Sequence, residues 1–373
     1  MTGKRSALEY FETLDDPRVV GRTLYPLMEI LLLTLCGVLS GAEDWVSIVE
    51  WGEMKLDWLR EFLPFKHGIP SHDVLGDVFA ALDAEKFERC FRDWIQSLCP
   101  ALAGKVVAVD GKTVRGSANG GGRKAIHLVS AFASESGLLL GQLKTAEKSN
   151  EITAIPELLS ALDVQGAIVT IDAMGCQKAI VEQIVTGGGD YVLAVKSNQR
   201  KLFEALVDFF DEGMQFGFGG FPCSFDETVE KDHGRIETRR CWAFGQVDWL
   251  LPEQQWRKLS MVGMIESVRD IAGKISIERR YYIGSIPAEA SQFGHAVRNH
   301  WGVENKLHWQ LDVSFREDDC RARLGNSAQN LSTIRRIALQ LLRQDASRKI
   351  GIRNSRLKAG WSDAYRARVL GLQ

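Results

Sequence analysis

The chain has 373 residues, of which 45% are hydrophobic and 25% are charged, and its formal net charge is −2. These values are ordinary for a soluble globular protein with two or more structural units. Seven scattered cysteines without a CxxC pair argue against a zinc site or a disulfide framework and fit a reducing cytoplasm. The longest apolar run, 30–39, is too short to span a bilayer and lacks the basic flank of a signal peptide, so it predicts a buried helix and no membrane partner.

Residues 1–100 are predicted to form a helical domain. Ser71 can cap a helix that runs to Leu82, and Asp83 can cap the next helix. That second helix repeats apolar residues at helical spacing, namely Phe87, Phe91, Trp94 and Ile95. Three tryptophans are expected in the core because no basic residues interleave with them, namely Trp45, Trp51 and Trp58.

The pattern changes at Lys105, where short apolar strands begin. Strands are predicted at 106–110, 126–133, 138–143, 167–171 and 191–195, and helices at about 151–162 and 177–185. The order β-β-β-α-β-α-β, in which a meander feeds parallel strands, is that of the ribonuclease H fold. Residues 101–343 are therefore predicted to form an α/β domain, a ribonuclease H-like mixed sheet with flanking helices.

A mostly β insertion is predicted within this domain at about 213–285. Alternating stretches indicate strands at 227–230, 236–242 and 276–283, and a hairpin turn is expected at 231–235. Helix returns at Pro287, a residue suited to a first helical turn.

Positive charge gathers at the end of the chain. Residues 320–373 contain twelve Lys or Arg and two acids, so this segment carries +10 and the remainder −12. A basic end on an acidic chain suggests a polyanion partner, although a solvated helical tail explains the charge equally well. Residues 344–373 are predicted to be a basic C-terminal tail, and Arg321 and Arg323 are candidate contacts with the polyanion.

Two acids end predicted strands: Asp110 follows Val109 and precedes a turn expected at Gly111, and Asp172 follows Ile171. If those strands are neighbours, the two carboxylates lie side by side and can hold divalent cations, since Mg²⁺ prefers oxygen ligands from separate elements. Phosphoryl transfer requires two such ions about 3.5–4 Å apart. A single Asp at a strand end is usually only a turn residue, but two at equivalent ends favour a metal site.

A third acid is expected from a helix. His300, Glu304, His308 and Asp312 recur at every fourth residue, along one gradually rotating helical face. Glu304 is the candidate ligand, and His300 and His308 would contact phosphate or orient its carboxylate. The alternative is a His/Glu site for Zn or Fe, which would leave the strand-end aspartates unused.

Glu317 and Asp318 are also close in sequence, but they belong to a charge run that is expected to be solvated or capping.

Basic residues follow these acids and strands. Lys112 and Arg115 come after Asp110, and three more follow other strands, namely Lys144, Lys148 and Lys196. Cations that contact phosphate are expected at the rim of a carboxylate site that holds a polyanion, although each of these taken singly is a typical solvated residue.

At these residues the sequence resembles the H-repeat-associated family of insertion-sequence DDE transposases. The matching pieces are AVDGK at 108–112, RGS at 115–117, KSNEI at 148–152, TIDA at 170–173, AVKSNQ at 194–199, HWGVEN at 300–305, LHW at 307–309, DVSFRED at 312–318 and the early LDDPR at 14–18. The resemblance covers nearly the whole chain. It departs from the Tyr-x2-Arg-x3-Glu-x6-Lys signature of the broader group, because Val297, His300 and Leu311 occupy those places around Glu304.

The resemblance implies a transposase that cleaves DNA at the ends of an insertion sequence and joins the 3′ ends to target DNA. Asp110, Asp172 and Glu304 would be the catalytic triad and would hold two Mg²⁺ ions, for which Mn²⁺ can substitute. Double-stranded DNA is the implied partner, bound by a homodimer in the bacterial cytoplasm at the nucleoid. The alternatives are a stand-alone Mg²⁺-dependent nuclease and an inactive transposon-derived DNA-binding protein.

Overall fold

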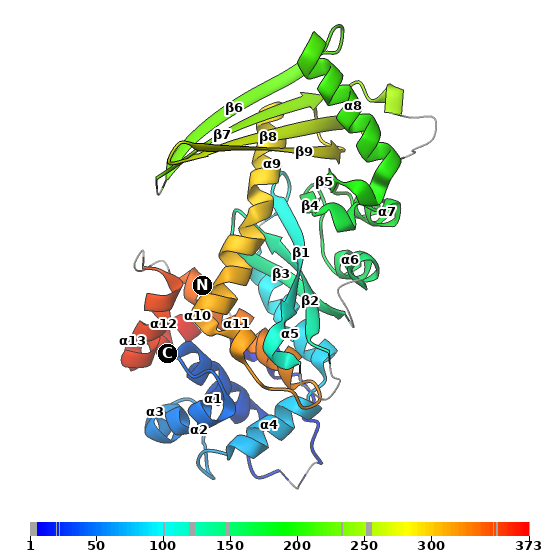
Figure 1. The fold of residues 1–373 in the computed structure, drawn as a ribbon. Helices are drawn as coiled ribbons and strands as arrows, with labels where there is room; N and C mark the ends of the chain where they lie inside the picture. Colours follow the sequence, from blue (N-terminus) through cyan, green and yellow to red (C-terminus); the bar gives the residue numbers. More distant parts are fainter. Residues whose placement is uncertain are drawn as a thin grey trace.

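The computed structural model describes residues 6–372 apart from positions 20, 22, 100, 119–123, 146–149, 233, 251–255, 346 and 348–349. Within these residues a single nine-stranded sheet has the order β3-β2-β1-β4-β5-β9-β8-β7-β6. Figure 1 shows helices from both ends of the chain at one end of the molecule, the first five strands in the middle and the last four strands at the other end.

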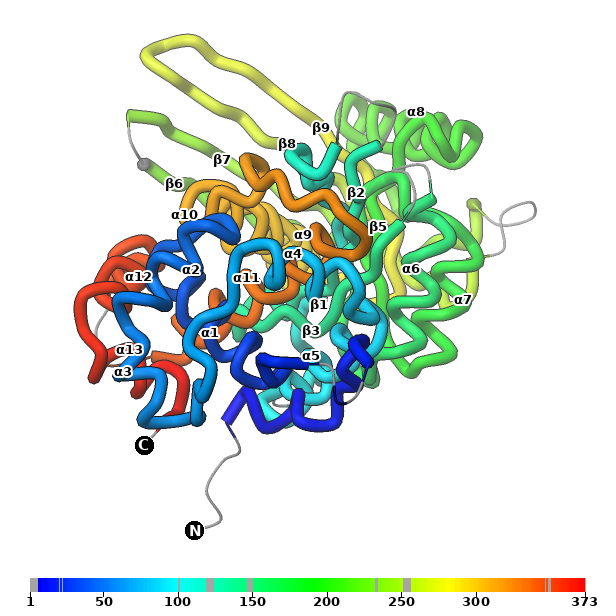
Figure 2. Tube along the Cα trace, turned by 90° about the horizontal axis from the view of Figure 1, so that it is seen from below, coloured from blue at the N-terminus to red at the C-terminus, as the bar shows by residue number. Residues whose placement is uncertain are grey.

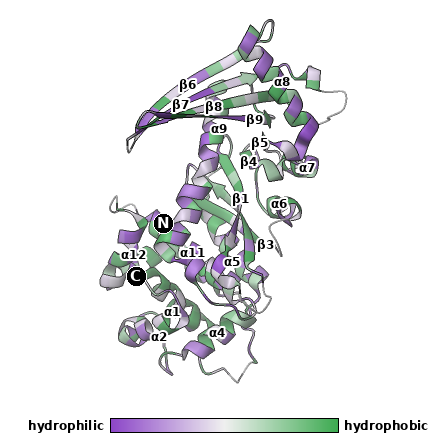
Figure 3. Ribbon diagram, in the orientation of Figure 1, coloured by the Kyte–Doolittle hydropathy of each residue, from purple (hydrophilic) through white to green (hydrophobic). Residues whose placement is uncertain are grey.

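The middle of the molecule has the predicted ribonuclease H-like arrangement. Its strands are β1 (Val106–Val114), β2 (Ile126–Ala133), β3 (Leu138–Thr145), β4 (Ile168–Ile171) and β5 (Asp190–Val195). The first three form an antiparallel meander, and β4 and β5 add parallel to β1. Helices α6 (Glu151–Ser160) and α7 (Lys178–Thr186) connect the parallel strands. The predicted fold class is confirmed, and the predominantly hydrophobic central strands stand out in Figure 3.

The predicted β insertion extends this same sheet. It consists of α8 (Arg200–Phe216), β6 (Cys223–Asp232), β7 (Arg235–Phe244), β8 (Met261–Ile271) and β9 (Lys274–Gly284), and β9 pairs antiparallel with β5. The expected turn at 231–235 joins β6 to β7, although His233 lies outside the described residues. Helix α8 and strand β8 were not predicted. The first six residues of β8 are buried, so its apolar run does not show the alternation of a half-exposed strand.

The N-terminal helices are a 3₁₀ turn (Ala7–Phe11), α1 (Leu27–Leu39), α2 (Trp45–Met54), α3 (Leu56–Leu59), α4 (His72–Ala81) and α5 (Ala84–Leu98). Both predicted caps are present, since Ser71 accepts from Val74 N and Asp83 accepts from two backbone N–H groups of α5. The predicted buried helix is α1, which is buried at almost every position. The three tryptophans belong to the core or pack against it, as predicted. Within the described ranges no helix has both the length and the apolar composition needed to cross a bilayer.

The chain ends in α9 (Ala290–Gly302), a π-helical segment (Val303–His308), α10 (Trp309–Phe315), α11 (Ser327–Gln344), α12 (Ile352–Trp361) and α13 (Asp363–Leu370). Helix α11 packs against α1, α4 and α5, and α12 packs against α1. The first and last helices accordingly lie side by side in Figures 1 and 2.

Part of the positive charge of residues 320–373 is therefore buried, including two of the seven Lys or Arg of the predicted basic tail at 344–373. Arg335, Arg336, Arg356 and Arg366 are buried. The Arg366 guanidinium lies 3.9 Å from the ring centroid of Trp58, and Arg356 donates to three backbone carbonyls. Composition does not reveal this, because a long Arg stem can pack in a core while its guanidinium is held by carbonyls and aromatic faces. Arg348 and Lys349 lie outside the described residues.

Removing the residues after Arg343 is expected to destabilise the helical domain rather than only weaken its electrostatics. The deletion removes α12 and α13 with their buried Tyr365, Val369 and Leu370. At roughly 1.5–3 kcal/mol for each large apolar side chain, the free energy of unfolding should fall by more than about 5 kcal/mol. Urea unfolding measures this, with the exposed-site variant Arg353→Gln as a control that should keep the midpoint. An unchanged midpoint after truncation would contradict the packing role.

Candidate active site

The acids Asp110 and Asp172 lie at one level of the sheet. The parallel register of β1 and β4 ends with Val109 opposite Ile171, so the next residue on each strand is an aspartate. Asp110 does not end its strand as predicted. β1 continues to Val114, paired with β2 alone. Asp110 is thus the first residue of β1 that has no partner on β4, so its side of the strand is free to face the site.

Gly111 continues β1 and does not form the predicted turn. A Cβ at this position would lie 2.4 Å from both Glu151 Oε1 and His127 Nε2. These two side chains are buried and 2.5 Å apart, and His127 Nδ1 is 2.9 Å from Thr113 Oγ1. Glycine is therefore needed for close packing against this pair.

Glu304 reaches Asp110 from the π-helical segment between α9 and α10. Oxygen atoms of Asp110 and Glu304 and a ring nitrogen of His308 all lie within 4.8 Å of one another. Single π-helical turns inside α-helices frequently occur at functional sites, because the extra residue re-aims the side chains. The predicted face with a residue at every fourth position is therefore interrupted at Glu304.

Asp172 stands beside this group of three but is not part of it. Its side chain is exposed, and Oδ1 accepts hydrogen bonds from Met174 N at 3.0 Å and Gly175 N at 3.4 Å. The charge of Asp172 still acts on Asp110 and His300. It raises the pKa of Asp110 and opposes the lowering of the pKa of His300.

The electrostatics of this site favour a bound cation. Burial raises the pKa of Asp110 to about 7, and the charges of Glu304, Asp172 and Glu151 add to the rise against one backbone hydrogen bond. Ionising Asp110 next to these carboxylates is unfavourable unless positive charge joins them. The residues present therefore fit a divalent cation, and the described chain has a possible metal site at Asp110, Glu304 and His308.

His308 is too buried to contact DNA phosphate, which was one of the two roles predicted for it. Its side chain is 8% exposed, and Nδ1 lies 3.5 Å from Asp110 Oδ2. Burial, Arg336 and Lys112 lower its pKa to about 3, so the imidazole is neutral. Nε2 has no hydrogen-bond partner among the described residues. The geometry fits the alternative role, in which His308 orients the carboxylates.

His300 lies one turn before Glu304, on α9. Its Nδ1 is 3.1 Å from Thr170 Oγ1 on β4, and burial lowers its pKa. His300 therefore connects α9 to the strand that ends at Asp172.

Lys112 does not lie at the rim, and a phosphate contact does not fit its position. It is buried, with Nζ 2.7 Å from Asp312, 2.9 Å from Asp318 and 3.4 Å from Glu317. These acids come from the segment after the π-helix, about two hundred residues later, so no local sequence signal paired them with Lys112. The ammonium joins β1 to that segment.

The remaining predicted cations are dispersed. Arg115 is exposed and approaches Asp318 at 3.5 Å, and Lys196 is exposed just after β5. Arg323 donates to Gly116 O, and both Arg323 and the exposed Arg321 line a cavity beside the start of α2. Lys144 is exposed on β3, and Lys148 lies outside the described residues.

Two sets of residues near the site had no predicted role. One is the His127–Glu151 pair, although Glu151 belongs to the quoted motif at 148–152. The other is a group of arginines on the inserted strands. Their signal in the sequence is the spacing of Arg residues along the alternating strands, a pattern that by itself indicates only β structure.

Two family models and several known proteins match this chain. Residues 102–341 match the family model described as the transposase DDE domain, and residues 8–95 match the model described as DDE_Tnp_1-associated. The chain is 42% identical over 373 residues to the inferred H repeat-associated transposase YhhI of Escherichia coli, with 98% of each chain covered. It is 41% identical over 375 residues to the inferred transposase YncI from another strain of that species, covering 98% of this chain and 94% of that one.

Among solved structures, a piggyBac transposase synaptic complex with hairpin DNA matches with a TM-score of 0.47 at 10% identity, over 98% of this chain and 80% of that chain. The family matches cover both the helical region and the sheet that carries the acids. On these grounds the chain belongs to the family of transposases with a DDE domain and, within it, to the H-repeat-associated group that its motifs predicted.

Proposed function

We propose that this transposase cleaves DNA at the ends of an insertion sequence and joins the freed 3′ ends to target DNA. The observation that carries the proposal is the parallel register of β1 and β4, which sets Asp110 level with Asp172 opposite Glu304. Three carboxylates from two strands and a helix are the donor set that in-line phosphoryl transfer needs.

Asp110, Asp172 and Glu304 would hold two Mg²⁺ ions, with Mn²⁺ as a substitute. Bound divalent cations activate the attacking oxygen and stabilise charge on the leaving oxygen. The ring nitrogen of His308 beside Asp110 suits Mn²⁺ better than Mg²⁺, since imidazole is a softer ligand. Activity in Mn²⁺ is therefore expected to equal or exceed activity in Mg²⁺.

The chain itself positions the reacting groups. His308 lies beside the Asp110 carboxyl on its buried side, and two backbone N–H groups donate to Asp172. Water attacks the phosphodiester first, and the 3′-hydroxyl then attacks target DNA in line, with no covalent enzyme intermediate. Exposed cations such as Arg115 and Lys196 contact the phosphates. Because two element ends must be joined together, a homodimer assembles on the DNA, at the bacterial nucleoid.

The proposal is tested with purified protein and a plasmid that carries the element with its native flanks. We expect divalent-cation-dependent 3′-hydroxyl ends at the element boundaries, followed by products joined to a second plasmid. Cleavage that is never followed by joining would identify a nuclease instead. DNA binding without any cleavage in Mg²⁺ or Mn²⁺ would identify an inactive DNA-binding protein, and either result would overturn the proposal.

A further inference from the structure

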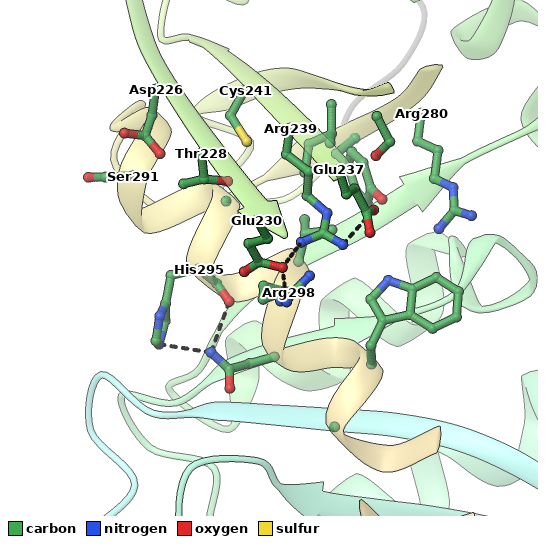
Figure 4. Close-up of a pocket in the computed structure, with 18 of the residues that line it drawn as sticks. Asp226, Thr228, Glu230, Glu237, Arg239, Cys241, Arg280, Ser291, His295 and Arg298 are labelled. Carbon is green, nitrogen blue, oxygen red and sulfur yellow. Dashed lines mark hydrogen bonds and ion pairs between the residues drawn. The ribbon is translucent and has the colours of Figure 1, made fainter. Parts of the chain in front are cut away.

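We propose that the groove between the inserted strands β6–β9 and helix α9 binds the phosphate backbone of the DNA strand that runs to the acidic site. This inference rests on the proposed function, because it gives the DNA a path across the protein. The groove, which we call the arginine groove, is lined by the β6–β8 hairpins on one side and by α9 on the other (Figure 4).

The position of the arginine groove connects it with the acids. It is a cavity of about 630 Å³ whose α9 wall runs from Ser291 through Arg298 to Trp301 and ends at Asn305 and Lys306. Glu304 precedes those last two residues in the same helical segment. At this end of the groove, the lining residue Trp301 also lies beside His300, with ring centroids 6.5 Å apart, so the groove ends close to the site of the acids.

The lining of the arginine groove is positive although the whole chain is not. Among its described lining residues, six Lys or Arg face three acids, whereas the chain has a net charge of −2. The six are Arg235, Arg239, Arg269, Arg280, Arg298 and Lys306. A concave surface with one dominant sign of charge concentrates the opposite charge, and here the matching ligand is a polyanion.

Four of the groove arginines share two carboxylates, whereas a fifth, Arg280, pairs with Glu278 at 2.9 Å. The buried Glu237 is 2.6 Å from Arg239, 3.3 Å from Arg269 and 3.6 Å from Arg235. Glu230 is 2.5 Å from Arg298 and 3.5 Å from Arg239, and Figure 4 shows it between the two. Four guanidiniums thus surround two carboxylates.

The consequence is a fixed array of unused N–H donors. Each guanidinium has five donors in a planar fork that matches phosphate oxygens, and the shared carboxylates hold the forks in place before a ligand arrives. The side chains of Arg235, Arg269 and Arg298 are about two-fifths to one-half exposed, so they are open to a ligand.

The opposite face of the same strands shows what a purely structural network looks like. There Arg240 contacts Glu227 at 2.7 Å and Glu266 at 3.2 Å, and Arg279 contacts Glu266 at 2.9 Å and Asp211 at 3.2 Å. Two arginines meet three carboxylates, so this row has no positive surplus. Because neighbouring residues of a strand point to opposite faces, Arg239 and Arg240 belong to different networks.

The two faces supply a matched experiment. We compare the groove variant Arg269→Gln/Arg298→Gln with the control variant Arg240→Gln/Arg257→Gln, which removes the same charge outside the groove. In the control Glu266 keeps Arg279, and Arg257 is an exposed residue that pairs with the exposed Glu182. In the groove variant, Glu237 and Glu230 each keep Arg239 as a partner, so the hairpins should still fold. Thermal melting of both variants checks this. Binding to a short fluorescein-labelled duplex is measured by anisotropy at several salt concentrations without divalent cation, so that no cleavage occurs.

We expect the groove variant to bind about ten-fold more weakly, with a salt slope smaller by about two, because two phosphate contacts are lost. The control should stay within about two-fold of the wild type. Equal losses in both variants, an unchanged groove variant, or a wild type that does not bind the duplex would each overturn the inference. If wild-type protein never cleaves DNA but the groove variant alone loses binding, the proposed function fails and this inference stands.

Discussion

The variant Asp110→Asn is expected to lose DNA cleavage by roughly a thousand-fold or more, since removing a metal-holding carboxylate costs several kcal/mol of transition-state stabilisation. Asn keeps the shape of Asp110 beside His308 and Glu304 but not its charge. The measurement is the rate of end cleavage in Mg²⁺ and in Mn²⁺. Duplex binding without divalent cation should be unchanged, because Asp110 does not line the arginine groove.

The same variant is expected to be more stable than the wild type at alkaline pH without divalent cation. Burial and the neighbouring carboxylates raise the pKa of Asp110 from 3.8 to about 7. Between these values the folded protein keeps a proton that the unfolded chain has released, so wild-type stability falls as the pH rises to about 7. Asn has no such proton. The difference in melting temperature should therefore be small near pH 4 and reach its maximum above pH 7.

The matched control is Asp208→Asn, an exposed carboxylate on α8 away from the site. It should cleave DNA normally, and the pH dependence of its melting temperature should follow the wild type. Addition of Mg²⁺ or Mn²⁺ should stabilise the wild type and the control but not Asp110→Asn. Normal cleavage by Asp110→Asn would rule out its role as a ligand.

The order of the strands could be predicted because apolar runs and turn residues are local signals. Those signals do not show which residues lie against one another in the folded chain. Gly111 was predicted as a turn because of its residue type, yet it continues β1 where two buried side chains leave no room for a Cβ. Strand β8 was missed for a related reason, since a strand segment buried on both faces shows less periodicity than a half-exposed one. Helix α8 was missed although its buried residues recur at helical spacing, namely Leu202, Leu206 and Phe210.

The candidate site shows the same division between local and long-range information. Asp110, Asp172 and Glu304 could be chosen from their places in strands and in a polar helical pattern. The π-helical segment could not, because the change in backbone hydrogen bonds leaves no mark in the spacing of polar residues. Lys112 was predicted to contact DNA phosphate, because its acidic partners Glu317 and Asp318 lie far away along the chain and could not be recognised from the sequence. The charge of the C-terminal arginines was visible in the sequence, but their burial was not.

Glu304 and Glu317 are expected to fail in different ways when each is replaced by Gln. Glu304 is exposed beside Asp110, so Glu304→Gln should unfold at the wild-type urea concentration while losing end cleavage. Glu317 is fully buried, with Oε1 2.7 Å from Arg336 and 2.5 Å from the Ser332 hydroxyl. Burial alone would raise the pKa of Glu317, but Arg336 and Lys112 lower it to about 2.

Glu317→Gln leaves two buried cations with one carboxylate fewer, and removing one partner of a buried ion pair costs roughly 3–5 kcal/mol. Its urea midpoint should fall accordingly. The wild type should also lose the stability that Glu317 gives as the pH drops from about 4.5 towards 2, where the folded carboxylate takes up its proton. Whatever fraction of Glu317→Gln remains folded should still cleave DNA, because this carboxylate faces Arg336 and Lys112 and not the group formed by Asp110, Glu304 and His308. If Glu317→Gln were fully stable but inactive and Glu304→Gln cleaved DNA at a near-normal rate, the third metal ligand would be Glu317 and not Glu304.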